Sequence, residues 1–275
     1  MSRLWGLAPM EAEPEPAGGA EGETFEAPGV SSFDLPPIFP GVPWFDKYIL
    51  QAIVAVILVL IFWLVMANKN KMVPSKGQFI GETAYFFVRN SIARDTLGHD
   101  FKRFLPFLIA LFSFILVNNL WGIFPFTLLP TASHAGWAYG MAAMVWFLYN
   151  GVGIAKHGFF GYLKNTTLPS GVPVFMWPLI IPLEFFSNIV VRPVTLALRL
   201  FANMFAGHLL VLVFVLGGEF LIFHGGSIVN VTAGVVAWIF SMAIFALEIF
   251  VQSLQAFIFT VLTAVYLSSA LAEEH

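Results

Sequence analysis

Two long apolar runs at the end of the chain limit its fold more than any other feature. They span Val194–Phe223 and Ile228–Ala270 and are 30 and 43 residues long. As continuous α-helices they would extend roughly 45 and 65 Å, whereas the hydrocarbon core of a bilayer is about 30 Å thick. Both helices must therefore tilt steeply, kink or leave the membrane. Because Gly225-Gly226 between them is a turn signal, we expect a long, strongly tilted helical hairpin.

Three earlier runs have the length of ordinary membrane spans. They are Tyr48–Met66, Phe104–Phe124 and Trp137–Ala155, each about 20 residues long and without Asp, Glu, Lys or Arg. Only 11% of the chain is charged and 59% is hydrophobic, whereas soluble domains are about one-quarter charged. The sequence therefore predicts an all-α, polytopic membrane protein with about five transmembrane helices, the last two forming the hairpin. The small net charge of −3 does not indicate a nucleic-acid partner.

The N-terminal region differs in composition from the rest of the chain. Residues 1–46 hold eight of the 16 acidic residues and are rich in Pro, Gly and Ala. Such a stretch cannot bury enough apolar surface to offset its ordering entropy. We expect an acidic, flexible, extracytoplasmic tail over residues 1–46 and a membrane domain over residues 47–275.

The distribution of basic residues predicts the orientation in the membrane. The connection 67–103 carries seven Lys and Arg residues and the connection 156–172 carries two, whereas the loops around Thr131 and Gly225 carry none. Since basic loops stay in the cytoplasm, we expect the N-terminus outside and the C-terminus inside a plasma membrane. The apolar stretch Pro173–Val191 is broken by prolines, and we expect it to lead into the fourth crossing from the cytoplasmic side.

Arg199, His208 and Glu248 are the candidate functional residues of the hairpin, whereas the three shorter spans contain no charged residue. A charge within a bilayer is costly, so an ionisable residue there is a functional candidate. Glu184 could line a cytoplasmic entrance, and Asn119 lies in the outer half of the second span.

Arg199 shares its helix face with small side chains. At 100° per residue, Ala202 and Ala206 lie on its side, and such a small-xxx-small pair lets another helix approach closely. Thr195 and Asn203 lie on the same face. This pattern favours a partner helix that passes directly in front of the arginine. The alternative is a structural arginine that pairs within its own bundle or reaches the interface.

The second arm of the hairpin carries a polar stripe. Ser241, Glu248, Gln252 and Gln255 fall within about 60° of one another on a helical wheel. The stripe is a functional candidate because polar residues inside a bilayer are costly. The alternative, strongest for Ser241 and Gln252, is a packed polar seam that holds the two arms together.

Distance from the hairpin turn predicts which polar residues share a depth in the membrane. Arg199 and Gln255 are symmetric about position 227, and His208 and Glu248 are symmetric about position 228. We therefore expect Arg199 near Gln255 in one layer and His208 near Glu248 in another. A His–Glu pair in a poorly solvated site can pass a proton near neutral pH.

Other classes of membrane protein fit the sequence less well. A secondary transporter for an anionic substrate would need unwound helices or paired Gly and Pro breaks near the midplane, and the hairpin arms show few. An intramembrane hydrolase would need a nucleophile or a metal motif, but the chain has no Cys, no HExxH and no GxSxG. A purely structural subunit would not require Arg199 on a face of small residues.

The segments LALRLFANMFAGHLL and LQAFIFTVLTAVYL resemble the two most characteristic segments of subunit a of F-type ATP synthases. The resemblance extends from about residue 44 to the end of the chain. It implies a stator subunit of the membrane Fo motor that performs no bond chemistry and needs no cofactor or metal. Such a subunit provides two proton half-channels beside a ring of c-subunits and couples proton flow to ATP synthesis. Its implied partners are the c-ring, the peripheral-stalk subunit b and the remaining synthase subunits.

The resemblance also implies roles for individual residues. Arg199 matches the essential arginine that faces the ring and separates the half-channels, and Gln255 matches the glutamine beside it. His208 and Glu248 match the outer half-channel pair, which is reversed in some relatives. Asn119 matches a channel asparagine, but the carboxylate that some relatives carry three residues later is Gly122 here, so the outer channel is expected to be wetted differently. The whole expected proton path comprises Asn119, Glu184, Asn203, His208, Ser241, Glu248, Gln252 and Gln255.

Overall fold

The computed structural model describes residues 25, 27–29, 33, 38, 45–67, 75–123, 130–168 and 173–272. All regular elements in these ranges are helices, as the sequence predicts. Five helical stretches are long and apolar enough to cross a membrane: Lys47–Ala67, Lys76–Leu120, Ala135–His157, Trp177–His224 and Ile228–Leu271. Each overlaps one of the five predicted runs, although the second begins at Lys76 and the fourth at Trp177, earlier than predicted, and Phe124 lies outside the described residues.

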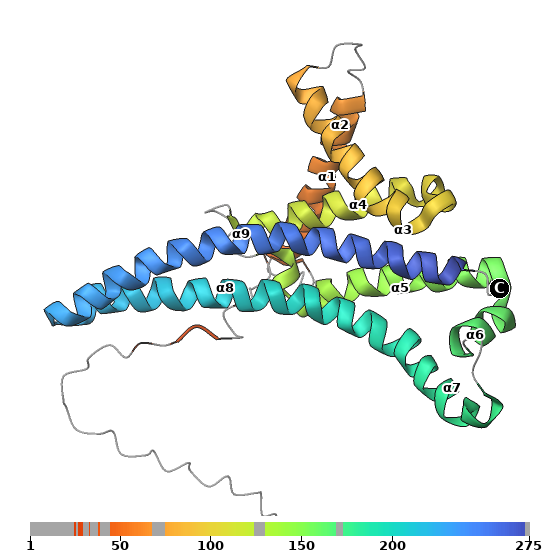
Figure 1. Cartoon of the computed structure of the whole chain (residues 1–275). Coiled ribbons are helices and arrows are strands. Elements are labelled where there is room, and N and C mark those ends of the chain that lie inside the picture. Colours follow the sequence, from red (N-terminus) through yellow and green to blue (C-terminus); the bar gives the residue numbers. More distant parts are fainter. Residues whose placement is uncertain are drawn as a thin grey trace, which may run out of the picture.

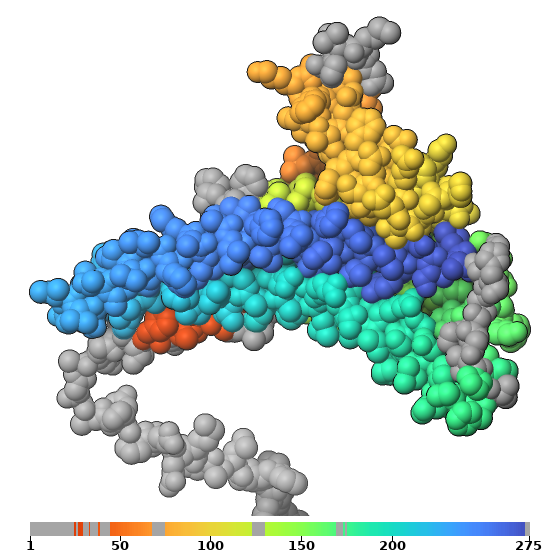
Figure 2. Space-filling model, in the orientation of Figure 1, coloured from red at the N-terminus to blue at the C-terminus, as the bar shows by residue number. Residues whose placement is uncertain are grey.

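The last two helices form the predicted hairpin. α8 (Arg192–His224) and α9 (Ile228–Leu271) run antiparallel and side by side (Figure 1). In the space-filling view their surfaces adjoin without a gap along this length (Figure 2). At the turn, Gly226 takes a φ of 60°, which glycine adopts without the steric cost of a Cβ. The Ser227 hydroxyl then caps α9 by accepting a hydrogen bond from the Val229 amide.

Two glycines allow the arms to approach closely near the turn. A Cβ added to Gly234 would lie only 2.7 Å from the carbonyl oxygen of Gly218. Trp238 Nε1 spans the same layer and donates a hydrogen bond to the Val215 carbonyl at 3.0 Å. Close backbone contact of this kind is a common way for helices to pack in membranes.

The N-terminal helices run across the direction of the hairpin. α1 (Lys47–Ala67) and α2 (Lys76–Val88) rise from it in Figure 1, and α4 (Phe101–Leu120) joins them to its surface. α1 has 21 residues, a length that suits a crossing close to the membrane normal. The hairpin must therefore be strongly tilted in any bilayer that α1 crosses in this way.

Much of the two basic connections is helical, although the sequence was interpreted there as loops. The first contains α2 because the Ser75 hydroxyl accepts a hydrogen bond from the Gln78 amide and caps that helix. The remaining short elements are η2 (Arg89–Arg94, a π-helical turn), α3 (Asp95–Leu97), η3 (Gly98–Asp100), η4 (Trp121–Ile123), η5 (Thr131–Ser133), α6 (Phe159–Thr167), η6 (Val174–Met176), α7 (Trp177–Phe186) and η7 (Ser187–Val191, a π-helical turn).

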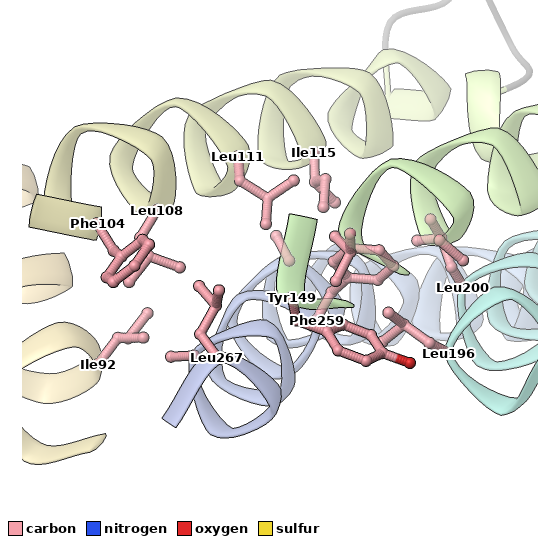
Figure 3. Close-up of a cluster of buried hydrophobic side chains, with 14 of the residues drawn as sticks. Ile92, Phe104, Leu108, Leu111, Ile115, Tyr149, Leu196, Leu200, Phe259 and Leu267 are labelled. Atoms are coloured by element: carbon pink, nitrogen blue, oxygen red, sulfur yellow. The ribbon is translucent and has the colours of Figure 1, made fainter. Parts of the chain in front are cut away.

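The apolar core lies between α4, α8, α9 and α5 (Ala135–His157) (Figure 3). Leu108 of α4, Leu196 and Leu200 of α8 and Phe259 of α9 are all 2% exposed or less. Outward-facing side chains are apolar as well, for example Leu64 at 63% exposed. A chain that is apolar on both its inner and its outer surface is suited to lipid rather than water.

Few residues of the expected flexible tail are described. One of them, Phe33, is 3% exposed and packs against Phe205 of α8. Tyr48 at the start of α1 donates a hydrogen bond to the Phe33 carbonyl at 2.7 Å. Phe33 therefore packs against α8 of the hairpin and against the start of α1. The flexibility of the tail stays a prediction.

Candidate functional site

Arg199 lies on an exposed strip of α8. Thr195, Ala202, Asn203 and Ala206 on the same strip are also exposed. Within the described residues, the Arg199 guanidinium has neither an ion pair nor a hydrogen bond. The opposite face of α8 is buried against the rest of the chain, so the helix presents this strip and its charge to the outside.

Amides join the two arms beside the arginine. Asn203 Nδ2 donates a hydrogen bond to Gln255 Oε1 at 2.8 Å. We expected Arg199 and Gln255 in one layer. The hydrogen bond to Gln255 in that layer comes from Asn203, one turn after the arginine. Behind it, Asn119 Nδ2 of α4 donates to the Gln252 carbonyl at 3.1 Å. Asn119, Gln252 and Gln255 are at most 1% exposed.

His208 and Glu248 form a buried side-chain pair across the hairpin. The contact joins His208 Nδ1 to Glu248 Oε1, and both side chains are only 5% exposed. The two residues therefore share the depth that their distances from the turn predicted. Ser241, also buried on this side of α9, uses its hydroxyl to donate to the Trp238 carbonyl in its own helix at 2.7 Å.

Several buried polar atoms in this region have no partner within the described part of the chain. They are Asn119 Oδ1, His208 Nε2, Glu248 Oε2, Gln252 Oε1 and Gln255 Nε2. An unsatisfied buried polar group costs about 1–3 kcal/mol, and buried water usually removes that cost. These atoms come from α4, α8 and α9, so together they can hold buried water between three helices.

A second polar region lies at the other end of α8, where the π-helical turn η7 joins α7 to α8. In η7 the Arg192 amide bonds to the Ser187 carbonyl, which frees the carbonyl of Asn188. Pro193 has no N–H, so the carbonyl of Ile189 also lacks its helical partner. The turn therefore exposes two adjacent backbone acceptors.

Two side chains of α5 satisfy these acceptors. Tyr149 donates its hydroxyl hydrogen to the Asn188 carbonyl at 3.1 Å, and Trp146 Nε1 donates to the Ile189 carbonyl at 2.9 Å. The bonds hold the bend in place, and α7 diverges from α9 beyond it (Figure 1). The sequence predicted that this stretch leads into the fourth crossing, and the structure shows α7, η7 and α8 as one bent helix.

The divergence leaves a pocket of about 300 Å³ between α5, α6, α7 and α9. Glu184 lines it and accepts a hydrogen bond from Asn188 Nδ2 at 3.0 Å. Arg192 also lines the pocket, with its guanidinium carbon 5.5 Å from the centre of the Tyr266 ring. The volume has room for several water molecules among polar partners.

Sequence reasoning missed the aromatic residues of this pocket. Tyr149, Tyr162 and Tyr266 come from three different helices, so no local pattern brings them together. Burial raises the pKa of the Tyr162 phenol, which therefore stays a neutral hydroxyl that donates to Asn150 Oδ1 at 3.0 Å. The only local signal was Pro193, which predicts a disturbed helix in the preceding turn.

Arg199 lies between the two polar regions along α8. It follows Arg192 of the pocket by two helical turns, about 10 Å of rise, and precedes His208 by about 14 Å. Arg199 is exposed whereas His208 is buried on the other side of the helix. The geometry is that of two separate polar regions with a fixed charge between them.

Comparison with known proteins assigns the chain to a family. The family model described as ATP synthase A chain matches residues 48–268. The chain is 49% identical over 267 residues to ATP synthase subunit a of Nocardioides sp., covering 93% of this chain and 96% of the relative. It is 44% identical over 255 residues to the protein of that name from Pseudarthrobacter chlorophenolicus, covering 91% and 95%. The chain therefore belongs to the ATP synthase A chain family.

Proposed function

We propose that the two polar regions are parts of two proton half-channels that meet a ring of partner subunits at Arg199. Membership of the family makes the chain the non-catalytic, proton-translocating stator subunit of the Fo sector. The observation that carries the proposal is the unpaired charge of Arg199 on an exposed strip of small residues, between the two polar regions.

The buried His208–Glu248 region would serve the outer half-channel. Protons would pass the unpaired polar atoms of Asn119, Gln252 and the His208–Glu248 pair on their way to the ring. The pocket beside Glu184 would serve the cytoplasmic half-channel. This direction follows from the basic segments, which orient the N-terminus outside and the C-terminus inside a plasma membrane.

Arg199 would control the ring carboxylate as it passes. A nearby guanidinium favours the ionised form of a carboxylate, and Arg does not lose its own proton in proteins. A carboxylate that gains a proton from the outer path is neutral and can turn into lipid. After almost a full turn it would reach the cytoplasmic path, lose the proton and meet the arginine again. The fixed charge would also block direct passage of protons between the two paths.

Membership of the family suggests the partner set. The exposed strip of α8 would face the c-subunit ring, and the peripheral-stalk subunit b would hold the stator in place. The unbroken helices over Arg192–His224 and Ile228–Leu271 support a sliding contact with a ring more than a transporter site, which uses interrupted helices.

ATP-driven acidification of inverted membrane vesicles tests the proposal. Arg199→Ala is compared with wild type and with Arg94→Ala, which removes an exposed cation outside the hairpin. We expect the complex to assemble in all three, with pumping lost only in Arg199→Ala. Passive proton leak in that variant should persist or rise, because the barrier between the half-channels is gone. Normal pumping by Arg199→Ala would overturn the assigned role.

A further inference from the structure

A groove between α1, α2 and α4 stands apart from the proton path. It has a volume of about 590 Å³, and its lining is mostly apolar. Leu60 and Trp63 of α1 form one wall, and Ile109 and Ala110 of α4 form another. Trp63 Nε1 donates a hydrogen bond to Ser113 Oγ at 3.1 Å, which fixes α1 against α4 beside the groove. The groove is therefore a built feature of the helix packing.

Two cations lie at one end of this groove. Arg89 comes from the π-helical turn after α2, and Lys102 comes from the first turn of α4. Among the residues that the structure describes, neither has a carboxylate in ion-pair distance. The Arg89 guanidinium carbon lies 5.9 Å from the ring centres of both Phe86 and Phe101. Aromatic contacts of this kind hold a guanidinium in place and leave its N–H groups for an anion.

The two cations mark a membrane boundary. Lys102 lies just before Phe104, where the charge-free run of α4 begins, and Leu60 and Trp63 lie in the last part of α1. From this boundary the groove follows α4 toward Ala110, into the apolar part of the span. The groove is cationic at the interface and apolar within the bilayer. It therefore complements an anionic phospholipid, which has a negatively charged head group and apolar acyl chains.

We propose that this groove binds one anionic phospholipid. Its phosphate accepts hydrogen bonds from Arg89 and Lys102, and one acyl chain lies along Trp63, Ile109 and Ala110. The arginine can give a phosphate two parallel hydrogen bonds, while the lysine adds a point charge. The ligand would connect α1 to α4 on the side of the chain away from α8.

A neighbouring pocket shows why basic residues alone do not define this site. The pocket has a volume of about 500 Å³ between α4, α5 and the end of α9, and Arg103 and Lys156 line it. However, the carboxylate of Asp100 lines it too, and Lys156 Nζ donates to the Leu271 carbonyl at 2.8 Å. Its charge is therefore partly neutralised, which makes Arg103 a suitable control position.

Photo-labelling of the assembled ATP synthase complex tests the proposal. The probes are phosphatidylglycerol and phosphatidylcholine, each with a photoreactive group on one acyl chain, and labelled peptides are identified by mass spectrometry. We expect phosphatidylglycerol to label peptides of α1 and α4 around Trp63 and Ala110. Phosphatidylcholine, which has no net charge, should label them roughly tenfold less.

Three variants separate the proposal from weaker explanations. Arg89→Gln/Lys102→Gln should reduce labelling by phosphatidylglycerol roughly thirtyfold, because each of the two cations near the surface contributes about 1 kcal/mol and about 1.4 kcal/mol corresponds to tenfold. Ala110→Phe should reduce it as well, because it fills the apolar end without changing the charge. Arg94→Gln/Arg103→Gln removes the same charge outside the groove and should leave labelling at the wild-type level.

Three other outcomes would each overturn the proposed lipid site. Equal loss in Arg94→Gln/Arg103→Gln would mean diffuse attraction to the membrane surface. Unchanged labelling in Ala110→Phe would mean that Arg89 and Lys102 attract free anions rather than a lipid in the groove. Absence of wild-type labelling here, while other helices are labelled, would mean that a partner protein covers the groove. Co-purification of each variant chain with the other synthase subunits confirms that the complex has assembled.

Discussion

The imidazole of His208 occupies the space in which a side chain at Gly122 would begin, so that a Cβ at position 122 would overlap the ring. On the other side of the pair, a Cβ added to Gly207 would lie 2.8 Å from Glu248 Oε1. The buried pair is therefore enclosed by two glycines. A longer side chain at position 122 has no room here, because the histidine of α8 already fills that place.

Gly122→Ala should displace His208 and disturb the proton path. Overpacking a buried site costs about 1–3 kcal/mol, and here the added methyl meets a member of the pair. We expect lower ATP synthesis in membranes that retain the assembled complex. Gly151→Ala in α5 is the control, since an added Cβ there meets nothing within 4 Å. Equal activity of the two variants would show that His208 can move without consequence.

Exchanging the His208–Glu248 pair should preserve function better than breaking it. His208→Ala or Glu248→Ala leaves one buried polar group without its partner, and losing half of a buried pair can cost about 3–5 kcal/mol. The double variant His208→Glu/Glu248→His keeps an acid and a base at the same depth. We expect its ATP-driven pumping to exceed that of either single variant. If it pumps no better than they do, the pair has a fixed orientation that the path requires.

The bend at η7 should depend on its two hydrogen bonds from α5. Trp146→Phe and Tyr149→Phe each leave a backbone carbonyl without its donor, at a cost of about 1–3 kcal/mol if the site stays dry. Amide hydrogen exchange should become faster in peptides that cover Ser187–Val191. Trp63→Phe loses a bond to Ser113 instead and should leave exchange at η7 unchanged. Faster exchange at η7 in all three variants would indicate general destabilisation.

Where the two arms of the hairpin approach each other most closely, at Gly218 and Gly234, we expect that no side-chain atom can be added. Gly234→Ala places a methyl against the backbone of Gly218, which cannot move aside as a flexible side chain would. We expect a lower melting temperature for the purified complex, consistent with an overpacking cost of about 1–3 kcal/mol. Gly217→Ala is the matched control, since its nearest new contact is the Phe25 ring at 3.7 Å. Because Gly→Ala raises helix propensity, an equal fall in melting temperature in both variants would show that the contact with Gly218 is not the cause.

The parts of the fold that the sequence predicted rest on one-dimensional signals. Long apolar runs with few or no charges define the five spans, and the glycine turn defines the hairpin. Once the turn is placed, His208 and Glu248 must share a depth, because antiparallel helices rise equally per residue. The exposure of Arg199 followed from the small residues at helical spacing on its face.

The parts that could not be predicted depend on contacts between distant segments. The π-helical turn η7 is held by Trp146 and Tyr149, about 40 residues earlier in the chain. The helices α2 and α6 were interpreted as loops because their basic residues were used only to predict which side of the membrane these segments face. A helix outside the bilayer can be as basic as a loop, and the Ser75 cap was the signal that could have identified α2.

The strip around Arg199 has a mechanical consequence. Helices usually lock together by fitting ridges of side chains into grooves, but Ala202 and Ala206 carry only methyl groups. Thr195 turns its hydroxyl back to the Val191 carbonyl at 2.8 Å, which smooths the strip further. In the proposed arrangement the ring therefore slides past a smooth surface and does not interlock with ridges of side chains. What holds the ring at one position is then electrostatic attraction between an ionised ring carboxylate and the charge of Arg199.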